Sequence, residues 1–521
     1  MVQTKEVLAE THLQYQLSFT LALCLFILLP PSLDCSQLIL FASSDVLLSS
    51  IWAEEKCGSA LACKDRPVLD SPFFIFTTKI AEPLCLGLML GVFLRLADSL
   101  PSLTFLSLFL LLICSLPLLF LLLVGSTRHT YPRGCQRLGL ANGESNLHDE
   151  FDPKYSHGVP RIQREGGQPS WRVKALFTYP LKSCAGIELS QSDVVPTGLK
   201  FDRHFVFAEN GPEGWNTRTL RNAGFERMAL IHPEIWIPCP SAPDYDPNLP
   251  EIKSQGVMLI SYPRITPTGP AGLFMRIAIS TGMLSARHTF SIPLNPPEEN
   301  LGNYPLIPVK IWKDKPLAHD YGIHLPPTLH RYLGFNPSTS PLTLFRSSDI
   351  NTRQIFRNAP RKEEIGFQPN TAFADAYPIH LLNLASHRDV ASRCAYAIPQ
   401  LSVRRFRANI IIQGPEAFAE DHWKRLDIAG VEIHAACRTV RCRLPNVDPL
   451  TGIRHAVEPD RTLKSYRKID EGDRTNACLG MQLVPALPEF VLRVGDEVGV
   501  LETGEHRYIK MLAPGEKVEG V

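Results

Sequence analysis

The chain has 521 residues, 45% of them hydrophobic and 20% charged, and a formal net charge of +1. That length can hold two or three domains, each with its own core. A balance of 53 Lys and Arg against 52 Asp and Glu gives no reason to expect a nucleic-acid partner. Function must therefore be carried by local motifs.

The first 100 residues contain only short apolar stretches, at 17–29 and 84–93. Each is too short to cross a bilayer, which takes about 20 residues as a helix. The segment before the first stretch is not basic, so a secretory signal peptide fits poorly. We assign no fold to residues 1–100 and treat them as an N-terminal extension.

Residues 103–124 read LTFLSLFLLLICSLPLLFLLLV, 22 residues without a charge. This run is long enough to span a membrane, and Pro117 is tolerated in such helices. The alternative is a buried core helix, which its length and unbroken Leu and Phe content disfavour. We predict a transmembrane signal-anchor at 101–125 and a linker at 126–168. The positive-inside tendency places the following part of the chain in the cytosol, because basic residues come directly after the run: Arg128, His129, Arg133 and Arg137.

The six cysteines after residue 150 form no closely spaced framework in a small domain, so we predict that they are reduced thiols. They are Cys184, Cys239, Cys394, Cys437, Cys442 and Cys478.

From Trp171 the pattern becomes β-type, broken by proline-rich segments such as 239–250 and 293–297. The pattern predicts a β domain with few helices. Its candidate strands are 173–177, 187–189, 205–208, 228–236, 257–261 and 273–279.

The stretch 405–467 centres on Cys442, which has arginines at 438, 441 and 443 around it. Nearby positive charge favours a thiolate, the form that binds a soft metal or acts as a nucleophile. Two other readings stay open. A cysteine is more often a core residue than a catalyst, and His434, Cys437 and Cys442 could supply three zinc ligands, although their spacing matches no common zinc motif.

The order of several motifs in this stretch resembles the MOSC domain. The motifs are RFRAN (405–409), W-x-x-L (423–426), a cysteine six residues before the Asp of V-D-P-x-T-G (Cys442 and Asp448), L-K-S-Y-R (463–467) and R-V-G-D (493–496). Upstream, Y-P-x-K-S (179–183) and D-R-x-F (202–205) resemble the MOSC N-terminal β-barrel domain. The resemblance implies a mixed α and β, β-rich fold behind the transmembrane helix, with the N-terminal β-barrel domain at 169–343 and a MOSC β-barrel domain at 344–515.

The resemblance also implies a molybdenum cofactor, a pterin that carries molybdenum and a phosphate. In that family the cysteine corresponding to Cys442 is the metal ligand, and here it would also be the catalytic residue. The residues expected to bind the cofactor are Lys182, Ser183, Arg203, Arg218, Arg407 and Asn409. The family's cysteine pair is spaced C-x2-C, whereas Cys437 and Cys442 are spaced C-x4-C. We therefore expect Cys437 to be structural or to lie behind the ligand.

Two functions follow from the resemblance. The first is a membrane-anchored, molybdenum-dependent oxidoreductase similar to the amidoxime-reducing component, in the mitochondrial outer membrane or the endoplasmic reticulum. It would reduce N-hydroxylated compounds with electrons from a b-type cytochrome and an NADH-dependent flavin reductase. The second is a cofactor-binding or sulfur-carrier protein related to the C-terminal domain of the molybdenum cofactor sulfurase. The sulfurase's upstream domain binds pyridoxal phosphate, but residues 1–165 show no motif for that cofactor, which favours the first function.

Overall fold

The computed structural model describes residues 131–161, 170–335 and 341–510, together with Ser107, Leu111 and Ser115. The chain divides into two compact units, Met1–Leu112 and Ile113–Val521, and the account below concerns the second. The predicted extension 1–100 and nearly all of the predicted span 103–124 lie outside the described residues. Within the described residues no helix is both long enough and apolar enough to cross a bilayer.

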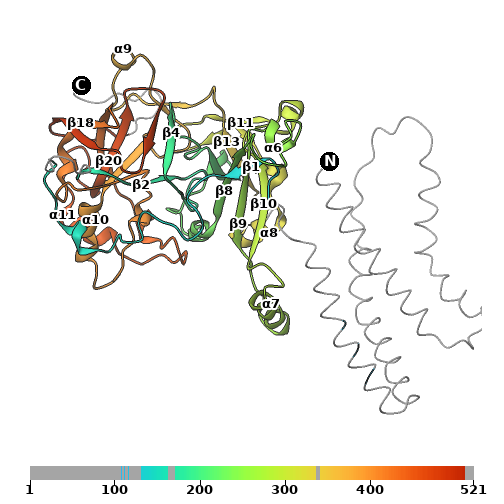
Figure 1. Cartoon of the computed structure of the whole chain (residues 1–521). Helices are drawn as coiled ribbons and strands as arrows, with labels where there is room; N and C mark the ends of the chain where they lie inside the picture. The colour runs from blue at the N-terminus through green and yellow to red at the C-terminus, as the bar shows by residue number, and fades with distance from the viewer. Residues whose placement is uncertain are drawn as a thin grey trace, which may run out of the picture. The chain divides into compact units, whose positions relative to one another are not determined.

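A four-stranded sheet and a closed barrel form one half of the described fold, mostly from residues 205–347 (Figure 1). An antiparallel sheet has the order β1-β8-β9-β10, and a closed barrel has the order β11-β12-β13-β6-β7. A buried cluster that includes Phe207, Tyr262 and Leu344 packs between them. The strands of the first sheet are Cys135–Arg137, His232–Pro238, Val257–Pro263 and Arg287–Pro293, and those of the barrel are Leu306–Lys310, Leu317–Asp320, Leu342–Ser347, Phe205–Gly211 and Gly214–Thr217.

An eight-stranded sheet forms the other half, in the order β22-β18-β19-β20-β16-β17-β2-β3. Its last two strands come from the start of the predicted barrel domain. β2 pairs with β17, so that Leu176 lies opposite Ile410. The strands are Val498–Thr503, Trp423–Ile428, Val431–Val440, Cys478–Pro485, Ile379–Asn383, Ile410–Gln413, Arg172–Thr178 and Ile187–Leu189. Two small sheets complete the fold: β21-β4-β5 (Phe490–Arg493, Gln191–Val195 and Gly198–Leu199) and β14-β15 (Arg353–Gln354 and Asn370–Thr371).

Helices are short and few in the described part of the chain. Asn383 caps α10 (Leu384–Arg393) by accepting from the backbone N–H of Ala385, and α10 buries Leu384 and Val390 in a cluster with β2 and β17. The other α-helices are α6 (Pro250–Lys253), α7 (Pro270–Ser280), α8 (Pro327–Leu333), α9 (Lys362–Ile365) and α11 (Asp460–Tyr466). The 3-10 helices are Pro153–Ser156, Glu226–Leu230, Glu298–Asn303, Gly322–His324, Val403–Phe406 (η5), Ala419–His422 (η6) and Leu444–Asn446 (η7).

The β-rich class is confirmed, and one of the two expected barrels is closed, whereas most strands of the C-terminal half form the eight-stranded sheet. The predicted strand 228–236 begins only at His232, because Glu226–Leu230 form a 3-10 helix. The strand predicted at 273–279 is helix α7, because Pro270 presets the first helical turn and Leu, Met, Ala and Arg favour a helix. The predicted linker is folded between residues 131 and 161. Within it β1 pairs with β8, and Leu147 and Tyr155 are buried.

Candidate active site

A cavity of about 610 Å³ lies where residues from the barrel half meet the eight-stranded sheet. Its lining is strongly basic, with Lys or Arg at 182, 203, 221, 313, 357, 407, 438 and 441 against Asp375 and Asp473. Six of the seven residues predicted from the motifs line it: Lys182, Ser183, Arg203, Arg407, Asn409 and Cys442. Segments more than 250 residues apart in sequence therefore converge on one basic cavity.

Cys442 is a free thiol at the cavity wall, between the end of β19 and the 3-10 helix η7. Burial raises the pKa of Cys442, while a hydrogen bond from the Leu444 backbone and the charges of Arg221 and Arg441 oppose the rise. The arginine charges thus act in the expected direction, but burial opposes them. Arg438 faces Glu505 and Asp470, and the exposed Arg443 faces Asp460. A metal at this thiol would have to displace its proton.

Lys182 and Ser183 lie on the turn after β2. The buried Lys182 ammonium donates to Asp375 Oδ1 at 2.7 Å and to the Phe373 carbonyl at 2.6 Å. Burial lowers the pKa of Lys182, and the Asp375 charge opposes that effect. The Ser183 hydroxyl accepts from the Leu220 N–H at 3.2 Å, which leaves its own O–H to donate.

Arg203 and Arg407 stack on one tyrosine. Their guanidinium carbons lie 4.6 and 4.3 Å from the centre of the Tyr179 ring. Arg203 is held by Asp202, Asn409 and the Arg407 carbonyl. Arg407 donates through Nη1 to the Cys184 carbonyl, but its buried Nη2 has no hydrogen-bond partner. Burial lowers the pKa of Arg407 to about 10, so this cation lacks the anion that would compensate its desolvation.

Four cavity residues have left-handed backbone conformations, although none is glycine. They are Ser183, Arg203, Trp312 and Arg407, with φ values of 69°, 51°, 54° and 55°. Such conformations cost about 1–3 kcal/mol each and persist only where the surroundings fix them. They are typical of ligand clamps, and here they turn three cations or donors and one indole toward the same space.

Asn409 lines the cavity, but protein groups already occupy both ends of its side-chain amide. Oδ1 accepts from the His380 N–H at 3.1 Å and from Arg203 at 2.9 Å. Nδ2 donates to the Phe177 carbonyl and to Asp202. Asn409 is thus placed to orient Arg203 and to join β16 to β2, not to offer a free amide edge to a ligand.

Arg218 is the one predicted site residue outside the cavity. It pairs with Glu209 through Nε at 2.6 Å and packs on Phe225. Its backbone N–H donates to the Phe207 carbonyl on the neighbouring strand β6, which also carries Glu209. Arg221, three residues later, lines the cavity and stacks on Trp312, with its guanidinium carbon 5.4 Å from the indole centre.

His380 is a cavity residue that the motifs did not indicate. Arg441 Nη2 donates to His380 Nε2 at 2.7 Å, and Arg441 Nε donates to the Leu479 carbonyl. Burial, reinforced by the charge of Arg441, holds the pKa of His380 well below its usual range. A neutral imidazole thus positions the arginine that precedes Cys442.

Cys437 does not line the cavity. It is fully buried with Ile355, Tyr377 and Val484, and burial raises its pKa to about 12 although Tyr377 hydrogen-bonds to it. The alternative of a zinc site at His434, Cys437 and Cys442 is not supported, because the described residues contain no group of three or more His, Cys, Asp or Glu arranged to hold a metal ion. All seven cysteines of the described residues are free.

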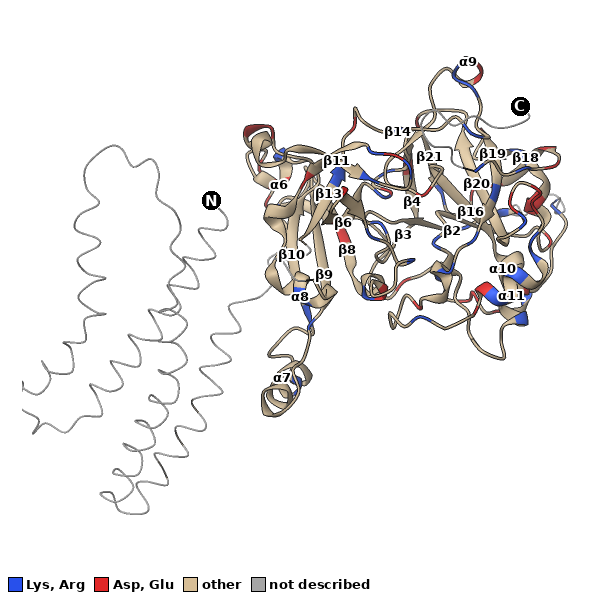
Figure 2. Ribbon diagram, turned by 180° about the vertical axis from the view of Figure 1, so that it is seen from behind, with Lys and Arg blue, Asp and Glu red and all other residues tan. Residues whose placement is uncertain are grey.

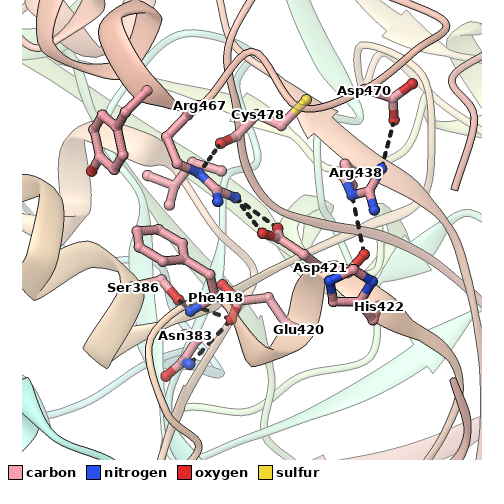
Figure 3. Close-up of polar contacts among 12 residues, drawn as sticks. Asn383, Ser386, Phe418, Glu420, Asp421, His422, Arg438, Arg467, Asp470 and Cys478 are labelled. Carbon is pink, nitrogen blue, oxygen red and sulfur yellow. Dashed lines mark hydrogen bonds and ion pairs between the residues drawn. The ribbon is translucent and has the colours of Figure 1, made fainter. Parts of the chain in front are cut away.

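A buried charge network supports the strand that leads to Cys442 (Figure 3). Arg467 Nη2 donates to both oxygens of Asp421, at 2.8 and 2.6 Å, and Nε donates to the Cys478 carbonyl. Arg438, on β19, lies 3.6 Å from Asp470. Next to Asp421, Glu420 Oε2 accepts from Ser386 at 2.8 Å and Asn383 at 3.1 Å. These contacts tie η6 and α11 to β19 and β20 behind the cavity.

The family comparisons agree with this architecture. Residues 170–249 match the family model of the MOSC N-terminal beta barrel domain, and residues 368–499 match that of the MOSC domain. The chain therefore contains one segment that matches each of these two domain families.

The chain is also similar to individual proteins. The chain is similar to mitochondrial amidoxime-reducing component 1 of Mus musculus, with 27% identity over 366 residues, which are 66% of this chain and 84% of that protein. It is 43% identical to mitochondrial amidoxime reducing component 2 of Rattus norvegicus over 138 residues, 26% of this chain and 38% of that protein. It is 23% identical to the molybdenum cofactor sulfurase of Homo sapiens over 348 residues, 64% of this chain and 32% of that protein.

The cavity residues fit the cofactor that these relatives' class implies. A pterin phosphate needs cations and donors, and the unpartnered Arg407 Nη2, the Ser183 hydroxyl and the Lys182 ammonium supply them. A soft metal needs a thiol at the wall, which Cys442 provides.

Proposed function

We propose that this protein is a molybdenum-cofactor-dependent oxidoreductase that reduces N-hydroxylated compounds. The observation that carries the proposal is the free thiol of Cys442 at the wall of a cavity whose other walls are cationic. One net reaction fits this class: the N–O bond breaks, two electrons and two protons are taken up, and an N–H bond and water form.

In this proposal Cys442 supplies the protein's thiolate to the metal, and Lys182, Ser183 and Arg407 hold the cofactor's phosphate. Arg203 and Asn409 set the position of Arg407. His380 fixes Arg441 beside the thiol. The bound cofactor would supply the two-electron oxygen-transfer chemistry, and the protein positions it and tunes it.

The electron donors and the membrane belong to the same proposal. A b-type cytochrome and an NADH-dependent flavin reductase would deliver the electrons. Residues 103–124 would anchor the chain in the mitochondrial outer membrane or the endoplasmic reticulum, with the MOSC region in the cytosol. The names of the amidoxime-reducing relatives favour mitochondria. Protease added to intact organelles should then digest the MOSC region, and protection until detergent is added would contradict this orientation.

The test of the reductase is a pair of matched variants. Cys442→Ala should abolish reduction of an N-hydroxylated substrate by the cofactor-loaded full chain with an artificial electron donor. Cys437→Ala removes an equally small side chain five residues away, outside the cavity, and should retain substantial activity. Undiminished N-reduction by Cys442→Ala would remove the central claim.

The match to the molybdenum cofactor sulfurase supports a second candidate, a cofactor-binding or sulfur-carrier protein. The same preparations distinguish it. A sulfur carrier would show a persulfide on Cys442 by mass spectrometry and no N-reduction even in the parent. A reductase should show N-reduction in the parent, and Cys442→Ser should lose turnover while the phosphate-binding residues still retain pterin.

A further inference from the structure

Helix α7 projects away from the other elements of the described fold (Figure 1). It lies in the connection between the adjacent strands β9 and β10 and projects beyond the end of their sheet. None of its residues belongs to the hydrophobic clusters found among the described residues. It therefore adds little to the core that the sheet itself builds.

The surface of α7 is nevertheless apolar. Its sequence, PAGLFMRIAIS, has a single charged residue. Phe274 is 72% exposed, and Leu273, Ile277 and the preceding Ile265 are each about half exposed. A helix that is hydrophobic around its whole circumference is normally buried, and an exposed apolar patch of this kind marks an interaction site.

The connection is also free of negative charge. No Asp or Glu occurs between Glu251 and Glu298, whereas Arg264, Arg276 and Arg287 fall within that interval. The ribbon of α7 shows no acidic residue (Figure 2). Arg287 is held by Ser261 and the Leu230 carbonyl, which leaves Arg276 on α7 and the nearby Arg264 to meet an anionic surface. An apolar helix with these arginines and no acidic residue is suited to the interface of an anionic bilayer, where arginines meet headgroups and Phe and Leu enter the acyl boundary.

Contacts within the connection fix both ends of α7, so this projecting tip of the fold is preformed. Gly272 packs against the Pro267 backbone so closely that an added Cβ would lie 1.8 Å from its carbonyl oxygen. The Leu284 N–H closes the C-terminal end on the Ala278 carbonyl at 2.9 Å. A preformed apolar tip loses little conformational entropy on docking.

We infer that α7 docks on an anionic lipid surface. Chain length gives a second reason besides charge. The uncharged run ends at Val124, and β1, which begins at Cys135, is the first strand of the sheet that carries α7. The ten residues 125–134 can extend at most about 36 Å. If residues 103–124 span a bilayer, this sheet therefore stays near the bilayer surface, and its projecting apolar tip is suited to touch it.

In the experiment, the photocrosslinking amino acid p-benzoylphenylalanine replaces Phe274 in the full chain. The protein is then mixed with vesicles of phosphatidylcholine alone, or with vesicles of phosphatidylcholine and phosphatidylserine. Position 356 is the matched control, because Phe356 is also 72% exposed and lies in the other half of the fold, between β14 and α9. We expect lipid adducts at 274 and none at 356, with a severalfold higher yield on the phosphatidylserine vesicles. Arg276→Glu should reduce that excess.

Three outcomes would overturn the inference. They are an adduct from 274 to a second copy or to residues 1–106 in place of lipid, equal lipid labelling at 274 and 356, and no adduct at either position. Because the readout is contact at one side chain, it is independent of N-reduction. It is also independent of membrane anchoring, since an anchored chain could float with the vesicles without labelling lipid through position 274.

Discussion

At the residue scale, Arg407 is the cavity residue best suited to bind an anion. Its guanidinium is stacked on Tyr179 and satisfied at Nη1, yet Nη2 is buried without a partner. Replacing Arg407 with Ala should weaken cofactor retention by about 1.5–3 kcal/mol, roughly ten- to a hundredfold, because a hydrogen bond to a charged group is lost.

The measurement is the pterin and molybdenum content after extensive dialysis, and Arg443→Ala is the control. Arg443 is adjacent to Cys442, but its side chain is 68% exposed and faces Asp460. It should retain cofactor like the parent. Equal retention by the Arg407 and Arg443 variants would show that Arg407 holds no part of the cofactor.

The motifs indicated Ser183, Arg203 and Arg407, which all line the cavity. The motifs did not indicate the left-handed backbone conformations of these residues. Arg218 does not line the cavity, because it pairs with Glu209 on the neighbouring strand. His380 was missed because its role depends on Arg441, 61 residues later in the chain.

At the element scale, η6 is held by a buried ion pair, Asp421 with Arg467. Asp421→Asn leaves Arg467 without its charge partner, so we expect a loss of about 3–5 kcal/mol of unfolding free energy. Glu432→Gln breaks the surface pair with Arg425, whose side chains are 35% and 43% exposed, and should cost about 0–1 kcal/mol. The urea concentrations at the unfolding midpoints of the Asp421→Asn and Glu432→Gln variants are compared with that of the parent. Equal shifts would refute a structural role for the buried pair.

Glu420, the neighbour of Asp421, makes the stability of this element depend on pH. Burial and then the Asp421 charge raise the pKa of Glu420 to about 7, and its hydrogen bonds from Ser386 and Asn383 only partly compensate. A raised carboxyl pKa contributes stability that is fully present below about pH 4.5 and is lost as the pH rises through about 7.

We therefore expect Glu420→Gln to flatten the fall in thermal midpoint between about pH 5 and 8, and to unfold at a higher temperature than the parent at pH 8. The parent and the variant are compared by thermal unfolding across that range. A parallel pair of curves would show that Glu420 does not titrate there.

Elements were predicted well where the hydrophobic period was clear. β2 (Arg172–Thr178) and β3 (Ile187–Leu189) formed where strands were expected, at 173–177 and 187–189. The run 273–279 lacks a strict alternation, and the helix-favouring start at Pro270 decided its form. Its exposure could not be read from the sequence, because an apolar run says nothing about what covers it.

At the scale of the whole molecule, the two predicted domains exchange strands, because the sheets do not follow the predicted boundary. β2 and β3 belong to the eight-stranded sheet of the C-terminal half, whereas β13, which crosses the predicted boundary at 343/344, belongs to the barrel. A linear sequence gives strand positions but not their pairing partners. The sequence boundary therefore cuts through the barrel and separates β17 from β2, its partner.

This interleaving predicts the behaviour of fragments. A chain of residues 344–521 lacks β2 and β3, which leaves β17 with an unpaired edge and exposes Ile410 and Ile412, now fully buried. It also lacks Lys182, Ser183 and Arg203. We expect this fragment to aggregate and to bind no pterin, even though it contains Cys442 and the whole matched MOSC segment 368–499.

A chain of residues 131–521 keeps both sheets and every predicted ligand, so it should be folded and cofactor-competent. Co-expression of residues 131–343 with residues 344–521 should restore some solubility to the shorter fragment, because the missing strand β2 is then supplied in trans. Solubility, circular dichroism and pterin content after expression distinguish these chains. A soluble 344–521 fragment with native-like pterin content would mean that the eight-stranded sheet closes without β2, and that the cofactor is held by the C-terminal half alone.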